Sequence, residues 1–363
     1  MDEDIIDYAL DCAMKKKIEY AEVRGSSQVA DGIMLRNGSL EAYVTAVDSG
    51  FCLRIMAGGG IGFASTNKWS REEARTITNL AFRYAKAARR KDKLSFAKEK
   101  GAKVKWTVEQ KKKIENIPTE ERVEALTEVN RGLASSGVNI PATMAQCSIS
   151  LITKYFVNSE GSYISSLVPK IGAYCFITVS EHGKTEQAYE QFGYSGGWEA
   201  FDKFKISEKM VHDAHVLKDV ITKAKPVKPG KMDLICGSEV AGIAAHESCG
   251  HPMEADRILG REMSQAGRSF IYQGGPYWIG TKIGNESVTV VDDPTVANSY
   301  GYYTYDDEGV KARRRFLYKN GVINEFLHNR ESAAKLGTRS NGSSRSVNYD
   351  REAIVRMANT FVL

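Results

Sequence analysis

Apolar residues recur at helical spacing in several segments of the chain. In the opening segment Ile6, Ala9 and Ala13 fall on one face, with acidic residues in the first turn and lysines at 15–17 behind the last. This arrangement predicts an amphipathic helix at 5–14 whose end charges suit the helix dipole. The same spacing, with Ser70 as the N-cap of the second segment, predicts further helices at 70–88, 120–135, 207–224 and 238–250.

Other segments alternate apolar and polar residues and carry turn signals, as antiparallel strands do. Between 20 and 66, short runs of this kind are separated by Asn37-Gly38 and by the glycines at 58–60, which predicts hairpins. Longer strands are expected between 145 and 198. Beyond residue 225 the expected strands are 231–236, 286–293 and 300–307, followed by a hairpin at 313–328 that turns on Asn320-Gly321.

Helices and sheets are segregated along the sequence rather than alternating regularly, which favours the α+β class with mixed antiparallel sheets and flanking helices. Pro226 and Pro229 interrupt the chain directly after the helix predicted at 207–224. We therefore predict two domains: an N-terminal α+β domain at 1–224, and a strand-rich C-terminal domain at 225–363 that carries the helix at 238–250.

Charge and cysteine usage narrow the function classes only a little. The 363 residues include 50 basic and 45 acidic side chains, interspersed, for a net charge of +5, which gives no strong attraction to nucleic acid or to an anionic membrane. The arginines at 313–315 belong to no recognisable reading module, so direct nucleic acid binding is not expected. Scattered cysteines, an acidic N-terminus and the lack of a long apolar stretch predict a soluble cytoplasmic protein with reduced thiols.

The strongest chemical signal is the run His246-Glu247-Ser248-Cys249-Gly250-His251 on the helix predicted at 238–250. Neutral imidazole nitrogens are common zinc ligands, and a neighbouring carboxylate can accept a proton from a water that the metal activates. We therefore consider His246 and His251 as metal ligands and Glu247 as general base. A buried helix on which two histidines fall close together without a metal fits the same pattern, since only three positions are specified.

The spacing of the two histidines does not suit a regular α-helix. Residues four apart lie about 40° apart around the helix axis, whereas residues five apart lie about 140° apart. His246 and His251 can therefore share one ion only where the helix is distorted. Gly250 and Pro252, on either side of His251, predict that the helix ends here with His251 extended. A π-bulge within the helix is the alternative solution.

Longer stretches of the sequence resemble a known family. AAHESCGHPMEAD at 244–256, the stretch at 287–327, VRMANTFVL at 355–363 and the glycine-punctuated stretch at 25–66 are similar to the TldD/PmbA family, also called modulators of DNA gyrase. The HExxxH run resembles the TldD branch. The resemblance implies a zinc metalloprotease acting on unfolded or extended peptides, with His246 and His251 as ligands and Glu247 as general base. It also implies a dimer, either with itself or with a PmbA-like subunit.

The resemblance further implies a third zinc ligand, a cysteine located beyond the strand that matches RMANTFVL. This sequence ends at Leu363. The expectation is therefore a chain that lacks the family's last part, either a truncated form that binds metal weakly or a short variant with a substitute ligand. Cys249, Glu254 and Asp256 are the candidate substitutes. The two carboxylates could instead fix the histidine tautomers by accepting hydrogen bonds from them.

The leading hypothesis is a peptidase that holds an extended peptide by strand addition to an exposed sheet edge. The alternative is a non-catalytic scaffold or assembly subunit of the family with an incomplete metal site. Two further segments carry expectations about the surroundings of the site. Asp306, Asp307 and Glu308 are expected in a solvated turn, and the small polar residues at 337–350 in a mobile loop near the site.

Overall fold

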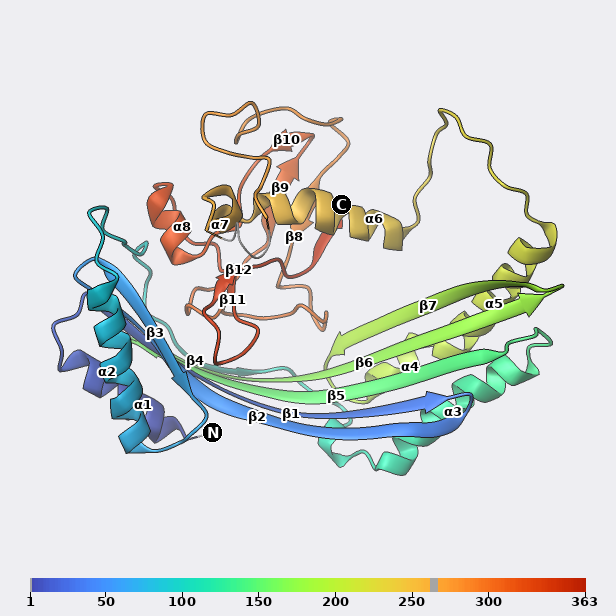
Figure 1. Ribbon diagram of the computed structural model, residues 1–363, viewed down its shortest axis with the longest axis horizontal. Coiled ribbons are helices and arrows are strands. Elements are labelled where there is room, and N and C mark those ends of the chain that lie inside the picture. Colours follow the sequence, from blue (N-terminus) through green and yellow to red (C-terminus); the bar gives the residue numbers. More distant parts are fainter. Residues whose placement is uncertain (1, 262–266) are drawn as a thin grey trace.

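A long curved sheet forms the centre of the computed structural model, which describes residues 2–261 and 267–363 (Figure 1). The antiparallel strand order is β3-β2-β1-β5-β6, and the second edge of β6 pairs with β4 in parallel and with β7 in antiparallel orientation. The strands are β1 (Tyr20–Arg36), β2 (Ser39–Ala57), β3 (Gly60–Thr66), β4 (Lys103–Thr107), β5 (Ala142–Asn158), β6 (Tyr163–Glu181) and β7 (Lys184–Ser195). The turn between β1 and β2 is the hairpin predicted at Asn37-Gly38, and both residues have positive φ.

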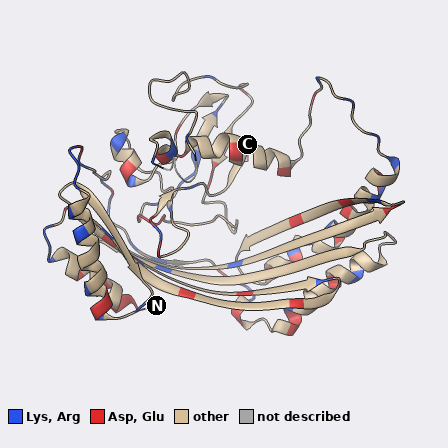
Figure 2. Cartoon of the chain, viewed as in Figure 1, with Lys and Arg blue, Asp and Glu red and all other residues tan. Residues whose placement is uncertain are grey.

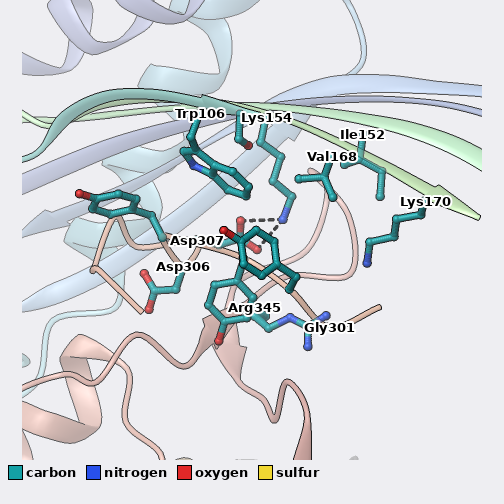
Figure 3. Close-up of a pocket in the computed structure, with 13 residues that line it drawn as sticks. Trp106, Ile152, Lys154, Val168, Lys170, Gly301, Asp306, Asp307 and Arg345 are labelled. Carbon is teal, nitrogen blue, oxygen red and sulfur yellow. Dashed lines mark hydrogen bonds and ion pairs between the residues drawn. The ribbon is translucent and has the colours of Figure 1, made fainter. Parts of the chain in front are cut away.

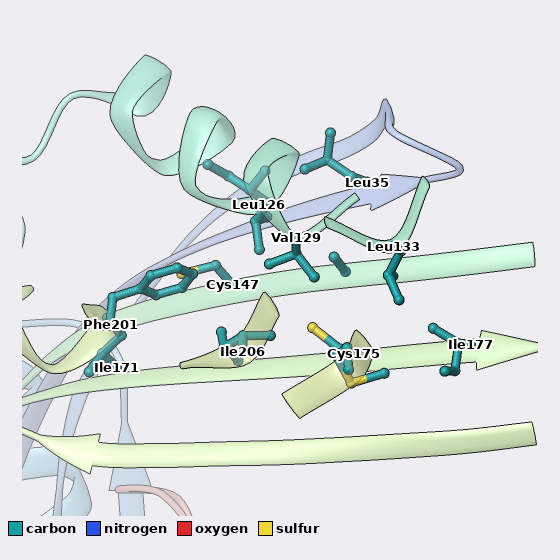
Figure 4. Close-up of a cluster of buried hydrophobic side chains, with 14 of the residues drawn as sticks. Leu35, Leu126, Val129, Leu133, Cys147, Ile171, Cys175, Ile177, Phe201 and Ile206 are labelled. Atoms are coloured by element: carbon teal, nitrogen blue, oxygen red, sulfur yellow. The ribbon is translucent and has the colours of Figure 1, made fainter. Parts of the chain in front are cut away.

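Two groups of helices cover one face of this sheet. At one end lie α1 (Glu3–Met14) and α2 (Arg71–Ala87), and at the other α3 (Thr119–Ser135), α4 (Glu199–Phe204) and α5 (Ile206–Lys223), with a short 3₁₀ turn at Ile114–Asn116. Ser70 caps α2 by accepting a hydrogen bond from the Glu73 amide, as predicted. Figure 4 shows Leu126 and Val129 of α3 against Cys147 of β5 in one of the two resulting cores.

Alternation along the strands makes one face of the sheet apolar and the other polar. On β1 the odd positions Val23, Ile33 and Leu35 are buried in the two cores beneath the helices. Successive side chains of a strand point to opposite faces. The even positions of β1, β5 and β6 therefore face the other side, where the C-terminal segment (residues 238–363) lies above the concave face of the sheet (Figure 1).

The C-terminal segment contains a smaller sheet of order β10-β9-β8-β13 and the separate pair β11-β12. The strands are β8 (Val290–Asp292), β9 (Arg315–Lys319), β10 (Val322–Ile323), β11 (Ser344–Arg345), β12 (Ile354–Val355) and β13 (Thr360–Val362); the helices are α6 (Ser238–Ala244), η2 (Ala245–Gly250), η3 (His251–Met253), α7 (Ala255–Ile258) and α8 (Arg330–Lys335). Ala245, Met253 and Leu317 belong to the core between this sheet and the helices. The hairpin of β9 and β10 turns on Asn320-Gly321, as predicted.

A buried ion network joins the C-terminal segment to the long sheet. Arg54 of β2 contacts Glu22 of β1 at 2.9 Å and Glu308 at 2.6 Å, and these three side chains are almost fully buried. Glu308 also accepts a hydrogen bond of 2.7 Å from the backbone amide of Arg330. The Arg330 side chain continues the network to Glu160 at 2.8 Å. These buried charge pairs hold the C-terminal segment against the long sheet.

The expectation of a solvated turn at Asp306-Asp307-Glu308 is wrong, because all three residues are at most 6% exposed. Asp306 accepts hydrogen bonds from the backbone amides of Glu308, Val310 and Ser344. Asp307 pairs with Lys154 of β5 at 2.7 Å. Since acidic triplets are usually exposed, only these distant partners explain the burial, and sequence alone does not reveal them.

Two strands predicted for the C-terminal half are absent from the described structure. Residues 231–236 form no strand, and Leu234 and Ile235 are largely exposed, because no neighbouring strand pairs with them. Residues 300–307 also form no strand, because their backbone amides donate to scattered carbonyls rather than to one neighbouring strand: Tyr302 to Ser299, Tyr303 to Pro294, Asp306 to Val310 and Asp307 to Ser344. The α+β class with antiparallel sheets and flanking helices is confirmed.

Most helices that cover the long sheet carry both signs of charge, while α1 carries four acidic and no basic side chains. Figure 2 shows Lys and Arg interspersed with Asp and Glu on most of these helices. Among the described residues, none of the helices combines the length and apolar character needed to cross a membrane.

Candidate metal centre

A π-helical turn brings the two histidines of the HExxxH run together. The α-helix α6 continues into η2, where the backbone amide of His251 donates to the carbonyl of His246, five residues earlier. In this hydrogen-bonding pattern residues five apart lie on one face. The imidazole rings of His246 and His251 have centroids 4.7 Å apart and are nearly perpendicular. The alternative that the sequence left open, a π-bulge, is therefore the observed distortion.

The prediction that Pro252 drives His251 into an extended conformation is wrong. His251 has helical dihedrals, φ −56° and ψ −42°, and begins the 3₁₀ turn η3. Pro252 is tolerated near the start of this turn because the first amides of a helix lack intrahelical acceptors. Gly250 is required by packing instead: an added Cβ would lie 1.8 Å from the Met357 sulfur.

His246, Glu247 and His251 form a candidate metal-binding group. One donor atom from each residue lies within 4.8 Å of the others. Burial lowers the pKa of His246, and the nearby His251 lowers it further; burial and Arg257 lower the pKa of His251. Both imidazoles are thus neutral at pH 7 and can ligate a metal. This mixed nitrogen and oxygen donor set fits zinc.

Glu254 and Arg257 both contact Nδ1 of His251. Glu254 is fully buried, and its Oε2 lies 3.2 Å from Nδ1 of His251. Arg257 pairs with Glu254 and also lies 3.0 Å from this ring nitrogen. A metal at Nε2 requires the proton of neutral His251 on Nδ1; in that tautomer Nδ1 donates to Glu254 and cannot accept from Arg257, whose guanidinium only donates.

The other two candidate ligands do not join the group that the structure gathers among the described residues. Asp256 uses both oxygens on backbone amides, those of Arg257 and Val355, each at 2.9 Å. It therefore fastens α7 to β12. Cys249 packs against the core of the C-terminal segment, and burial raises the pKa of its thiol. A raised thiol pKa opposes the thiolate form that binds metals.

A cavity of about 690 Å³ opens between this centre and the polar face of the long sheet. Its walls include both imidazoles and a segment at 345–348, part of the predicted loop. The floor is made of even positions of the sheet strands, among them Arg24, Lys154 and Lys170. Sequence analysis missed these cations. The alternation of β1, β5 and β6 places them on one face, but the pairing of distant strands that brings them together is not visible in sequence.

Replacing Gly250 by Ala is expected to lower the free energy of unfolding by about 1–3 kcal/mol, because the new methyl group overlaps the Met357 sulfur. Met357 or the π-turn must shift to relieve this overlap, and zinc affinity should fall to the extent that the turn moves. Chemical denaturation and zinc titration measure the two effects.

Gly242 offers a matched control on the same helix, because an added Cβ there meets no atom within 4 Å. Gly242→Ala should be neutral or stabilise by up to about 1 kcal/mol. Equal effects of the two substitutions would show that Met357 does not constrain the π-turn.

Comparison with known proteins identifies the family. The profiles described as PmbA/TldA metallopeptidase domain 1, central domain and C-terminal domain match residues 21–88, 112–224 and 229–363. The chain belongs to the PmbA/TldD family. A protein named metalloprotease from Methanothermobacter thermautotrophicus is 29% identical over 353 residues, covering 96% of this chain and 73% of that protein.

Two further members of the PmbA/TldD family extend the comparison. A zinc metalloprotease TldD homolog from Saccharolobus solfataricus is 24% identical over 348 residues, which cover 94% of this chain and 72% of that protein. The crystal structure of TldE from Thermococcus kodakarensis has a TM-score of 0.73 at 17% identity, covering 99% of this chain and 77% of that one. At this identity the structural match establishes the fold alone.

Proposed function

We propose that this chain is a zinc-dependent metallopeptidase of the TldD type that hydrolyses unfolded or extended peptides, with His246 and His251 as zinc ligands and Glu247 as general base. The π-helical turn carries the proposal, because it brings both imidazoles and the carboxylate within 4.8 Å of one another. The names of the relatives support it and do not favour a non-catalytic scaffold.

Each residue of the centre has a distinct part in the proposed reaction. Bound zinc would supply a Lewis acid that polarises the peptide carbonyl and lowers the pKa of a water molecule. Glu247 accepts the proton of the attacking water and passes it to the leaving amine. The buried Glu254 carboxylate contacts Nδ1 of His251. This contact orients the ring so that Nε2 can bind the metal.

The polar cavity supports an extended substrate rather than a folded one. It lies between the long sheet and the C-terminal segment and borders both histidines, a space that suits a chain without tertiary structure of its own. Backbone hydrogen bonds to a sheet edge hold such a chain without reading its side chains. The cavity volume of about 690 Å³ falls within the range of small-ligand sites, which matches a short length of peptide.

We propose further that the protein works as a dimer, with itself or with a PmbA-like subunit. Residues 39–50 of β2 pair with β1 alone within the described structure, and leave one strand edge open. The side chains of Leu40, Val44 and Val47 on this segment are exposed. An open edge with apolar side chains is suited to a second subunit.

Zinc titration of the purified chain, with hydrolysis of an unstructured fluorescent peptide measured in parallel, tests the function. We expect about one zinc per chain and zinc-dependent cleavage. His246→Ala and His251→Ala should each weaken zinc binding well over tenfold, since loss of an outer hydrogen-bond partner alone costs roughly 10–100-fold.

His182→Asn is the matched control, because His182 is an exposed histidine in the turn between β6 and β7, away from the cavity. This variant should bind zinc as the parent chain does. Zinc binding that survives removal of both His246 and His251, or cleavage that persists in a chelator, contradicts the proposal.

A further inference from the structure

The cavity beside the candidate metal centre has a pronounced positive charge. Five cationic side chains line it, and the described residues on its walls include no carboxylate: the cations are Arg24, Lys154, Lys170, Arg345 and Arg356. A surface of one sign in a partly enclosed site concentrates the field and attracts ligands of the opposite sign. The positive charge of the cavity therefore favours substrates that carry negative charge.

Two of these cations have carboxylate partners just outside the cavity. Lys154 pairs with Asp307 at 2.7 Å, and Arg356 lies 3.7 Å from Glu254. Their charges are largely compensated by these neighbours. Neither residue is expected to select a ligand by itself.

Arg24, Lys170 and Arg345 differ, because the hydrogen bonds that the described structure gives them end on backbone carbonyls. Arg24 donates to the carbonyl of Arg351, but its charge also interacts with Asp307 and Glu22, which leaves Lys170 and Arg345. Lys170 of β6 donates to the carbonyl of Tyr300 at 2.8 Å, and Arg345 of β11 donates to that of Met357. Each also makes a cation–π contact, Lys170 with the ring of Tyr300 and Arg345 with the ring of Tyr303. These contacts orient the two cations without neutralising them.

The two head groups converge from opposite walls. Figure 3 shows a smaller neighbouring pocket that shares these two residues and is also lined by Asp306 and Asp307; in it Lys170 descends from the sheet toward the side where the Arg345 guanidinium lies. Burial, with the added repulsion of Arg345 and Lys154, lowers the pKa of Lys170 to about 8. An anion between Lys170 and Arg345 would relieve this repulsion and satisfy the remaining N–H donors of both groups.

We propose that Lys170 and Arg345 form a subsite that binds a carboxylate of the peptide substrate. The proposal rests on the peptidase function proposed above, because the subsite and the two histidines line the same cavity. Carboxylates are the fixed anions of an unmodified peptide, and they occur at its C-terminus and on Asp and Glu side chains. The subsite thus gives the enzyme a preference that backbone recognition alone cannot supply.

Binding of labelled peptides to the metal-free 363-residue chain, followed by fluorescence anisotropy, tests the subsite separately from catalysis. One neutral sequence is used with a free C-terminus, with an amidated C-terminus, and amidated with an internal Glu or Gln. We expect the peptides that carry a carboxylate to bind about fivefold to tenfold more tightly than their neutral counterparts, the effect of one charge-assisted hydrogen-bond pair. The free acid and the internal Glu arms identify which carboxylate is preferred.

Lys170→Gln should remove this difference while leaving the affinity of the amidated neutral peptide unchanged, and Lys170→Arg should retain it. Lys184→Gln, at the exposed first residue of β7, is the control for an equal loss of net charge. It should behave as the parent chain.

Equal affinities for acid and amide peptides, alongside intact zinc-dependent hydrolysis, would refute the subsite alone. Tighter binding of a single-stranded oligonucleotide than of the acidic peptide would also refute it, by assigning the cations to phosphate. If no peptide binds and none is cleaved by the zinc-loaded protein, the subsite and the peptidase function fail together.

Discussion

Glu247→Gln is expected to lower peptide hydrolysis by roughly 10²–10⁴-fold, the usual contribution of a general base, with zinc still bound. The amide keeps the size of the side chain but cannot take the proton of the attacking water. His246 and His251 are unchanged in this variant, so the metal-binding nitrogens remain in place. Zinc affinity and the single-turnover cleavage rate are measured on the same preparation.

Glu239→Gln is the matched control for this variant, because Glu239 is exposed in the first turn of α6, on the same helix. It should leave both quantities unaltered. Loss of zinc from Glu247→Gln would make Glu247 a ligand rather than a base. Unchanged hydrolysis with zinc in place would remove Glu247 from the mechanism.

Glu308→Ala should destabilise the fold by about 3–5 kcal/mol, because it leaves Arg54 buried without its closest carboxylate partner. The substitution also removes the acceptor for the Arg330 amide. Since Glu308 is one of the residues through which the C-terminal segment contacts β2, the loss weakens the junction between the two parts that enclose the cavity. Chemical denaturation measures the change in stability.

The exposed ion pair of Arg36 and Glu41 beside the β1-β2 turn provides the comparison. Glu41→Ala should change stability by no more than about 1 kcal/mol, because an exposed pair is well solvated whether or not it is made. If the two substitutions have similar effects, the network around Arg54 does not support the junction between the two parts.

Sequence predicts those parts of the fold that local rules determine. The cap of α2 by Ser70 and the turns at Asn37-Gly38 and Asn320-Gly321 depend on neighbouring residues, and the structure confirms each of them. The strand predicted at residues 231–236 does not form, because a strand needs a pairing partner as well as suitable residues. The prediction of a solvated turn at 306–308 is wrong for a related reason. The burial of these acidic residues depends on partners such as Lys154, far away in the chain.

The candidate site divides in the same way. The HExxxH run is a local pattern, and its spacing already requires a distorted helix. The choice between a π-turn and an extended His251 is not set by this local pattern, and in the π-turn Gly250 packs against Met357, more than a hundred residues away. The positive subsite has no local pattern at all, because Lys170 and Arg345 meet only after the C-terminal segment covers the sheet.

Anomalous diffraction at the zinc absorption edge, from crystals of the chain soaked in zinc, tests the central claim most directly. The account predicts one peak bonded to Nε2 of both His246 and His251 at the usual Zn–N distance of about 2.0–2.1 Å, with the π-turn retained. A peak at any other place, or a regular α-helix on which the two rings face apart, would contradict it.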